Sequence, residues 1–132
     1  MPTRISKAFD FDAAHSLPLM PDGHKCKRLH GHTYRVEFIL RAELNELWMV
    51  ADYADIEAAW LPIHARLDHQ HLNTIPEIGP KSTTEYLAWF IMREFRRGAP
   101  NLPLVAVRVY ESSTTWAEVE PPLGELPDGY LS

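Results

Sequence analysis

Three histidines and the only cysteine of the chain fall within nine residues, in the run HKCKRLHGH from His24 to His32. Imidazole and thiolate groups are common zinc ligands, and a thiolate near a base can also move protons. His30 and His32 lie two residues apart at the start of an alternating segment, so their side chains point to the same face of a strand. The run therefore indicates a metal site, proton-transfer chemistry or a polar strand end.

A third histidine, His15, ends the alternating segment 5–15 on its apolar face. Residues 32–42 alternate in the same way, and an antiparallel hairpin of the two segments would bring His15, His30 and His32 together near its open end. Three neutral imidazoles with one free position are the ligand set of a catalytic zinc. Histidines that merely end polar strands would show the same spacing, so the spacing leaves both interpretations open.

Cys26 lies four residues before His30, in the loop that precedes the second alternating segment. It could be a fourth metal ligand, which would close the site. Lys25 and Lys27 flank it, and nearby positive charges favour the thiolate, which is the reactive form of cysteine. The remaining interpretations are therefore a proton-transferring thiolate beside the metal or an unreactive loop thiol.

A second histidine patch, RLDHQHLN, follows a predicted helix and contains the adjacent residues Asp68 and His69. A carboxylate can orient and charge a neighbouring imidazole, and such a pair beside a thiol would form an acid–base relay. The alternative is a helix C-terminus that carries cations against the helix dipole. The other histidines of the chain, His24, His64 and His71, are interpreted as surface or packing residues.

Glu111 ends the predicted strand 103–111 on the same face as the valines at alternate positions. A carboxylate on the core side of a strand is costly unless it is paired. It could accept two parallel N–H bonds from a planar, amidine-like group of a ligand. A salt bridge to an arginine of the chain is the simpler alternative.

The elements that must position these residues are readable from the hydrophobic pattern. One helix begins after the N-cap Asp52, and a second begins with a capping box of Ser82 and Glu85 and ends at Gly98. Residues 115–120 are predicted to form a strand that pairs with the strand 103–111 in a hairpin. The order ββααββ predicts an α+β fold, a four-stranded antiparallel sheet with two helices on one face, whose free edges favour oligomerisation.

Length and composition exclude several classes of protein. The 132 residues suit one domain over 1–132, with 121–132 as a C-terminal tail. A net charge of -5 and a pI near 5.8 argue against nucleic-acid binding, and no apolar run approaches the roughly 18 residues that would span a membrane. One cysteine and the lack of an apolar signal core predict a cytoplasmic protein without a disulfide.

The runs FDAAHSLP, GHKCKRLHGHTY, MVADYADIE, LDHQHLN and STTE, followed by a strand that ends in Glu111, resemble the 6-pyruvoyl-tetrahydropterin synthase family as an ordered set. The C-x3-H-G-H spacing is more similar to its bacterial branch, 6-carboxytetrahydropterin synthase. The resemblance covers about residues 5–120 and implies the tunnelling fold. Ser82 stands where proline is common in the family, which puts only the local loop geometry in question.

The resemblance implies roles by position. It implies zinc ligands at His15, His30 and His32, catalytic residues at Cys26, Asp68 and His69, and pterin-binding residues at Glu111, Thr83, Thr84 and Glu85. It implies Zn²⁺ as the cofactor and a homohexamer, a dimer of trimers in which each trimer closes a twelve-stranded barrel and the sites lie between subunits.

The implied reaction is a zinc-dependent lyase reaction of 7,8-dihydroneopterin triphosphate. Its products would be 6-carboxy-5,6,7,8-tetrahydropterin, acetaldehyde and triphosphate, on the route to 7-deazaguanine and queuosine. Cys26 and the Asp68–His69 pair would move protons on opposite sides of the substrate side chain, and Lys25, Lys27 or Arg28 would meet the triphosphate. The alternatives are a 6-pyruvoyl-tetrahydropterin synthase, a non-catalytic zinc or pterin-binding protein, and a generic zinc hydrolase.

Overall fold

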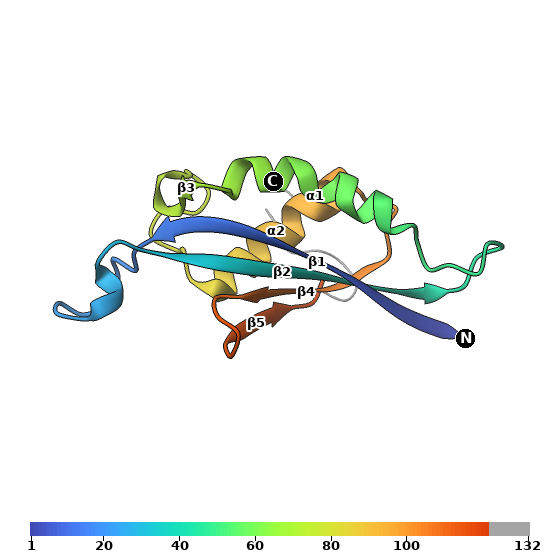
Figure 1. Ribbon diagram of the computed structural model, residues 1–132, viewed down its shortest axis with the longest axis horizontal. Coiled ribbons are helices and arrows are strands. Elements are labelled where there is room, and N and C mark those ends of the chain that lie inside the picture. Colours follow the sequence, from blue (N-terminus) through green and yellow to red (C-terminus); the bar gives the residue numbers. More distant parts are fainter. Residues whose placement is uncertain (122–132) are drawn as a thin grey trace.

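A computed structural model describes residues 1–121, and the expected tail lies outside the described residues from position 122 onward. The strands are β1 (Pro2–His15), β2 (His30–Glu43), β3 (Gln70–His71), β4 (Leu104–Tyr110) and β5 (Trp116–Val119). The helices are α1 (Tyr53–Leu67) and α2 (Thr84–Gly98), with short 3-10 helices η1 (Lys25–Lys27) and η2 (Leu72–Thr74). Both helices lie on one side of the sheet (Figure 1). No helix among residues 1–121 is long and apolar enough to cross a membrane.

The expected α+β arrangement is confirmed, but the sheet has five strands, in the order β3-β1-β2-β4-β5, rather than the expected four. The additional strand, β3, pairs in parallel with Ala13 and Ala14 of β1, while the other pairings are antiparallel. β3 has two residues, too few for alternation to reveal a strand in the sequence. The sheet is therefore mixed, and β3 holds the segment after α1 beside the end of β1.

β1 and β2 form an antiparallel ladder of 14 residues each, which dominates the sheet. The expected alternation is confirmed, because one face of the ladder is buried under the helices. The buried side chains of that face include Phe11, Ala13, His15, Tyr34, Val36, Phe38 and Leu40. The register sets His15 opposite His30 and Ala13 opposite His32, so the helix-covered face carries histidines at the end of the hairpin that the loop 16–29 connects.

Side-chain caps start both long helices, one as expected and one not. The Asp52 carboxylate accepts a backbone N–H of the first turn of α1 at 2.9 Å, which confirms the predicted cap. The predicted capping box of Ser82 and Glu85 is wrong, because the N-cap of α2 is Thr83, whose hydroxyl accepts the Tyr86 N–H. Three adjacent hydroxyl residues can all cap a helix, so the sequence does not choose among them.

Phe38 of β2 joins the sheet to both helices. Its ring centroid lies 4.4 Å from that of Phe95 in α2 and 5.8 Å from that of Trp60 in α1. Phe9 of β1 adds an edge-on contact at 6.1 Å. Because Phe38 is fully buried among aromatic rings from three elements, the packing of both layers depends on it.

Replacing Phe38 by alanine should lower the free energy of unfolding by about 3–5 kcal/mol, because it leaves a cavity among those rings. Leu61→Ala on the exposed side of α1 is the matched control and should cost no more than about 0.5 kcal/mol. Urea unfolding, followed by circular dichroism at one fixed protein concentration, measures both values. Equal decreases in the free energy of unfolding in the two variants would contradict the central position of Phe38.

Candidate metal centre and active site

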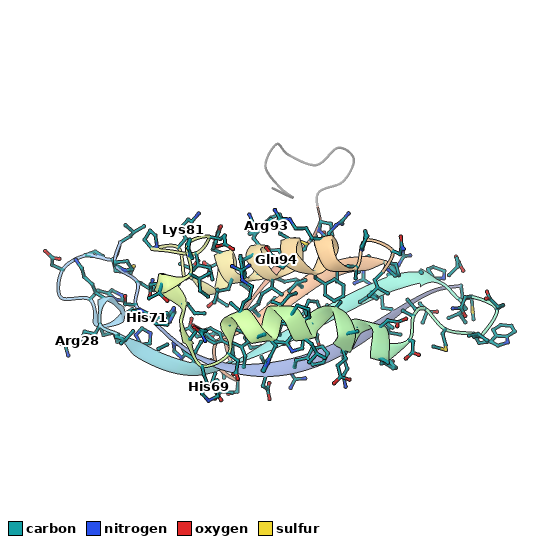
Figure 2. The ribbon with its side chains drawn as sticks, turned by 90° about the horizontal axis from the view of Figure 1, so that it is seen from above. Arg28, His69, His71, Lys81, Arg93 and Glu94 are labelled. Atoms are coloured by element: carbon teal, nitrogen blue, oxygen red, sulfur yellow. The ribbon has the colours of Figure 1, made fainter. Side chains whose placement is uncertain are left out.

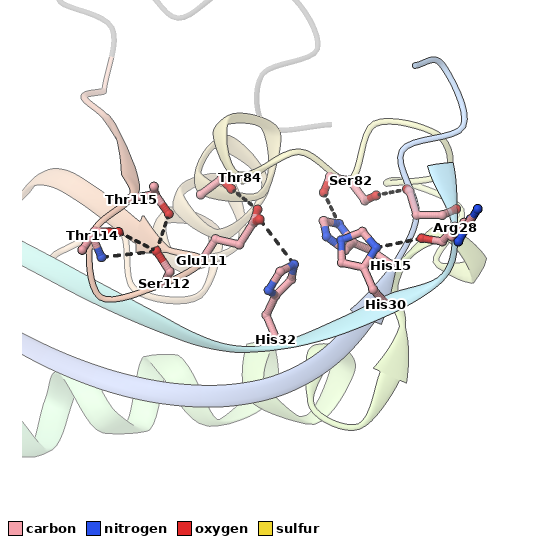
Figure 3. Close-up of polar contacts among 11 residues, drawn as sticks. His15, Arg28, His30, His32, Ser82, Thr84, Glu111, Ser112, Thr114 and Thr115 are labelled. Carbon is pink, nitrogen blue, oxygen red and sulfur yellow. Dashed lines mark hydrogen bonds and ion pairs between the residues drawn. The ribbon is translucent and has the colours of Figure 1, made fainter. Parts of the chain in front are cut away.

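Three histidines meet where the loop 16–29 joins β1 to β2 (Figure 3), not at the open end of the hairpin that was predicted from the sequence. The ring centroids of His15 and His30 are 4.6 Å apart, and that of His32 lies 5.1 Å and 4.9 Å from them, respectively. One nitrogen of each ring lies within 4.8 Å of the corresponding nitrogens of the other two. Among the described residues, these three are the group of side chains close enough to hold a metal ion, and Cys26 is not part of it.

Backbone carbonyls fix the orientation of two of the three rings. Nδ1 of His15 lies 2.8 Å from the carbonyl oxygen of Ser82, and Nδ1 of His30 lies 2.7 Å from that of Arg28. A carbonyl can only accept a hydrogen bond, so each Nδ1 carries the proton and each neutral ring keeps its lone pair on Nε2. This is the outer-shell arrangement that orients histidine ligands of metals.

His15 is the most buried of the three, with 1% of its surface exposed. Burial lowers the pKa of His15, with the charges of His30 and His32 adding to the effect, against the opposing hydrogen bond to Ser82. Its Nε2 is buried and has no hydrogen-bond partner among residues 1–121. A neutral imidazole with an unsatisfied, inward-facing nitrogen fits a metal ion, because coordination would satisfy that nitrogen.

Glu111 lies next to this group, at the end of β4. Its Oε2 accepts a 2.8 Å hydrogen bond from the Thr84 hydroxyl, and its Oε1 lies 3.3 Å from Nε2 of His32. The His32 contact is an ion-pair distance without hydrogen-bond geometry, since that nitrogen has no hydrogen-bond partner among residues 1–121. The observed partners of Glu111 are therefore a histidine and a threonine rather than the arginine of the simpler alternative, and its oxygens keep further lone pairs for a ligand.

Ser82 and Asn73 support the site, and the sequence argument missed both roles. The Ser82 hydroxyl, fully buried, donates to the Ser16 carbonyl at 2.9 Å and accepts from the Asn73 side-chain amide at 3.1 Å. The same amide contacts the Ser16 and Gly79 carbonyls at 3.1 and 2.8 Å. Asn73 thus ties the end of β1 to the segment before α2. The available signal was a polar residue, Asn73, placed between the apolar residues Leu72 and Ile75.

Cys26 lies in η1 and is partly exposed. Its N–H donates to Nδ1 of His24 at 3.1 Å, and its carbonyl accepts the Leu17 N–H at 2.7 Å. His24 therefore caps the turn that carries the thiol, which gives a specific role to a residue interpreted only as a surface or packing residue. Of the neighbouring cations, Lys27 forms an ion pair with Asp22.

Asp68 and His69 form a hydrogen-bonded pair directly after α1. Oδ2 of Asp68 lies 2.8 Å from Nδ1 of His69, and Oδ1 accepts the Asp12 N–H at 2.9 Å. The pKa of Asp68 is lowered, chiefly by the Asp12 N–H and then by His69. The pKa of His69 is raised by its hydrogen bond to Asp68. The pair therefore has the electrostatics of an acid–base group in which the imidazole holds its proton more firmly than a free histidine does.

His69 and the three-histidine group lie on different faces of the sheet. His69 lines a shallow depression of about 370 Å³ with Asp12, Ala14 and Gly31, whose strand positions alternate with those of the buried histidines. Figure 2 shows His69 beside the strands, close to the C-terminal end of α1. His69 has a left-handed backbone, with φ of 58°, and its N–H donates to the Asp12 carbonyl at 2.6 Å.

The other residues assigned to pterin binding start α2. Thr83 uses its hydroxyl as the helix cap, and Thr84 donates to Glu111. Glu85 is exposed in the first turn, where a carboxylate complements the helix dipole. Of these three residues, Thr84 is therefore the one that hydrogen-bonds to the Glu111 carboxylate.

A mixed sheet with both helices on one face and three histidines at the end of its long hairpin is the tunnelling fold expected from the sequence. The chain belongs to the 6-pyruvoyl tetrahydropterin synthase family, whose sequence model, described as "6-pyruvoyl tetrahydropterin synthase", matches residues 4–122. The resemblance seen in the motifs is thereby confirmed.

Two relatives and one solved structure illustrate the similarity. A "putative 6-carboxy-5,6,7,8-tetrahydropterin synthase" of Archaeoglobus fulgidus is 36% identical over 116 residues, 87% of this chain and 93% of the relative. The 6-carboxy-5,6,7,8-tetrahydropterin synthase of a Synechocystis species is 33% identical, over 86% of this chain and 89% of that one. The 6-pyruvoyl tetrahydropterin synthase of Caenorhabditis elegans superposes with a TM-score of 0.80 at 21% identity, covering 91% and 96% of the two chains. At 21% identity, the similarity to the Caenorhabditis elegans structure shows the fold alone.

The three-histidine group should bind one divalent transition-metal ion per chain. His30→Ala and His32→Gln should each weaken binding by more than about 100-fold, since loss of an outer-shell partner alone costs roughly 10–100-fold. His71→Ala, an exposed histidine outside the group, is the matched control and should bind normally. Metal content by mass spectrometry and calorimetric titration measure these values, and unchanged binding in both ligand variants would refute the site.

Asp68→Asn should lower the pKa of His69 back towards the ordinary value near 6.5. The reason is that the carboxylate favours the protonated ring, so the pairing is present below the raised pKa of His69 and is lost as the pH rises through it. On the acid side it is lost as the pH falls through the lowered pKa of Asp68. A titration of the His69 ring by NMR measures the change, and an unmoved titration would contradict the pairing.

Proposed function

We propose that the chain is a zinc-dependent carbon–carbon lyase that converts 7,8-dihydroneopterin triphosphate to 6-carboxy-5,6,7,8-tetrahydropterin, acetaldehyde and triphosphate. The observation that carries the proposal is the three-histidine group beside a carboxylate, Glu111, that no arginine neutralises within the described residues. The names of the Archaeoglobus and Synechocystis relatives support the carboxy branch. The reaction would serve 7-deazaguanine and queuosine synthesis in the cytoplasm.

The donor set supports zinc as the metal. Three imidazoles, two of which have their Nδ1 protons held by backbone carbonyls, would leave a fourth position open, as in catalytic zinc sites. Zn²⁺ bound by His15, His30 and His32 would act as a Lewis acid on the side-chain hydroxyls of the substrate.

The residues of the chain would bind the pterin and move protons. Glu111, held by the Thr84 hydroxyl, would accept the two parallel N–H groups of the ring edge, which orients the substrate side chain towards the histidines. His69, charged by Asp68, would give or take a proton on one side of that side chain, and the Cys26 thiolate would act on the other.

The complete site would combine residues of two copies of the chain. His69 and the three-histidine group lie on different faces of one sheet, and among residues 1–121 no hydrogen bond or ion pair joins Asp68 or His69 to that group. A neighbouring copy would therefore supply the Asp68–His69 pair, in keeping with the homohexamer that the motifs implied. In the loop, Lys27 is already paired with Asp22, so Lys25 and Arg28 are the better candidates for the triphosphate.

Two other functions remain as alternatives. A 6-pyruvoyl-tetrahydropterin synthase would use the same residue types, eliminate triphosphate and keep the three-carbon side chain. A non-catalytic zinc or pterin-binding protein would need neither Cys26 nor the Asp68–His69 pair.

Incubation with 7,8-dihydroneopterin triphosphate should release acetaldehyde and give a product with the mass of carboxytetrahydropterin. Prior removal of the metal with a chelator should abolish both, and added Zn²⁺ should restore them. Mass spectrometry of the pterin and an acetaldehyde assay measure the outcome. A product that retains the three-carbon side chain would rule out the lyase and support the pyruvoyl synthase.

Cys26→Ala should reduce kcat by about 10²–10⁴-fold, the range typical of a lost proton-transfer group, while the metal content stays at one per chain. Leu19→Ala, at an exposed position of the same loop, is the matched control and should change neither quantity appreciably. Loss of the metal from the Cys26 variant would instead make the thiol a fourth ligand and close the proposed open position.

A further inference from the structure

The Asp68 carboxylate contacts two imidazoles rather than one. Its Oδ2 lies 2.8 Å from Nδ1 of His69 and 3.6 Å from Nε2 of His64. His64 lies one helical turn earlier, in the last turn of α1, and its carbonyl accepts the Asp68 N–H at 2.8 Å. The two residues are therefore fixed to each other by the backbone as well as through their side chains. His64 was expected to be only a surface or packing residue.

The surroundings limit what else can act on this carboxylate. From β1, the Asp12 N–H binds Oδ1, and the Asp12 carboxylate, which accepts a bond from the Thr33 hydroxyl, adds negative charge near His69. Among the described residues, His64 and His69 are the two potential cations within 4.0 Å of the Asp68 oxygens. The charge that Asp68 presents to His69 thus depends on His64.

We propose that His64 is a positioning residue that shares the Asp68 carboxylate with His69 and thereby sets how firmly His69 holds its proton. When His64 carries a proton, Asp68 faces two cations, and its attraction for the His69 proton is reduced. The ring of His64 packs edge-on against buried Trp60, with centroids 5.7 Å apart, so the core fixes its position. The inference rests on the proposed function only in taking His69 as a proton-transfer group.

A purely structural role is the competing explanation for His64. A cation in the last turn of a helix interacts favourably with the helix dipole, and the imidazole also covers part of Trp60. Such a role would make lysine an acceptable replacement, and it would not change the titration of His69. Charge-altering substitutions at this position therefore separate the two explanations.

The test compares His64→Gln, which is always neutral, with His64→Lys, which is always charged, in the metal-loaded protein. NMR titration of the His69 ring should give a pKa that is highest in the Gln variant, intermediate in the wild type and lowest in the Lys variant. The His69 pKa should differ by about 0.5 between the Gln variant and the wild type, and by about 0.5 again between the wild type and the Lys variant, as expected for partly exposed charges. In an Asp68→Asn background most of this difference should vanish, because the shared carboxylate is gone.

The same His69 pKa in all three proteins, or a difference that persists undiminished with Asn at position 68, would overturn the proposal. The pH profile of kcat with 7,8-dihydroneopterin triphosphate is the second readout, and its alkaline limb should move in the same order as the His69 titration. If the titration moves while the profile does not, the coupling between His64 and His69 stands. The role of His69 in the proposed reaction would then be the part that fails.

Discussion

The register of the β1–β2 ladder is the constraint on which the rest of the structure depends. Because His15 faces His30 across the ladder, and His32 follows two residues later, three imidazoles share one face next to the connecting loop. A slip of one residue would turn those side chains of one strand to the opposite face and would also expose Phe38 or its partners. The aromatic core therefore protects the histidine cluster, since the same register serves both.

Around that cluster, the chain uses backbone carbonyls rather than carboxylates to orient the rings. The carbonyls of Ser82 and Arg28 belong to loops, so the precision of the site depends on how those loops are held. Asn73 holds one of them by bridging the end of β1 and the segment before α2. The Glu111 carboxylate is therefore not needed to orient the rings of His15 and His30. Its charge faces the histidines and the start of α2.

The sequence predicted the parts of the site that follow from strand alternation and missed those that depend on loop conformation. Alternation in the two long strands was enough to predict that the histidines meet. The Asp52 cap was predictable because an aspartate directly before an amphipathic segment is a typical helix N-cap. The cap of α2 was misassigned, because Ser82 has a buried partner that only the folded chain supplies. The face on which His69 lies was likewise hidden, because a two-residue strand, β3, determines it.

The left-handed backbone of His69 has an evolutionary consequence. A φ of 58° is costly for an ordinary side chain, whereas glycine adopts it without penalty and asparagine with little. At this position the residue that would serve the proposed proton transfer is thus not the one that best fits the backbone conformation. A lineage freed from selection for its activity would be expected to lose this imidazole early, and to gain thermal stability as it did so.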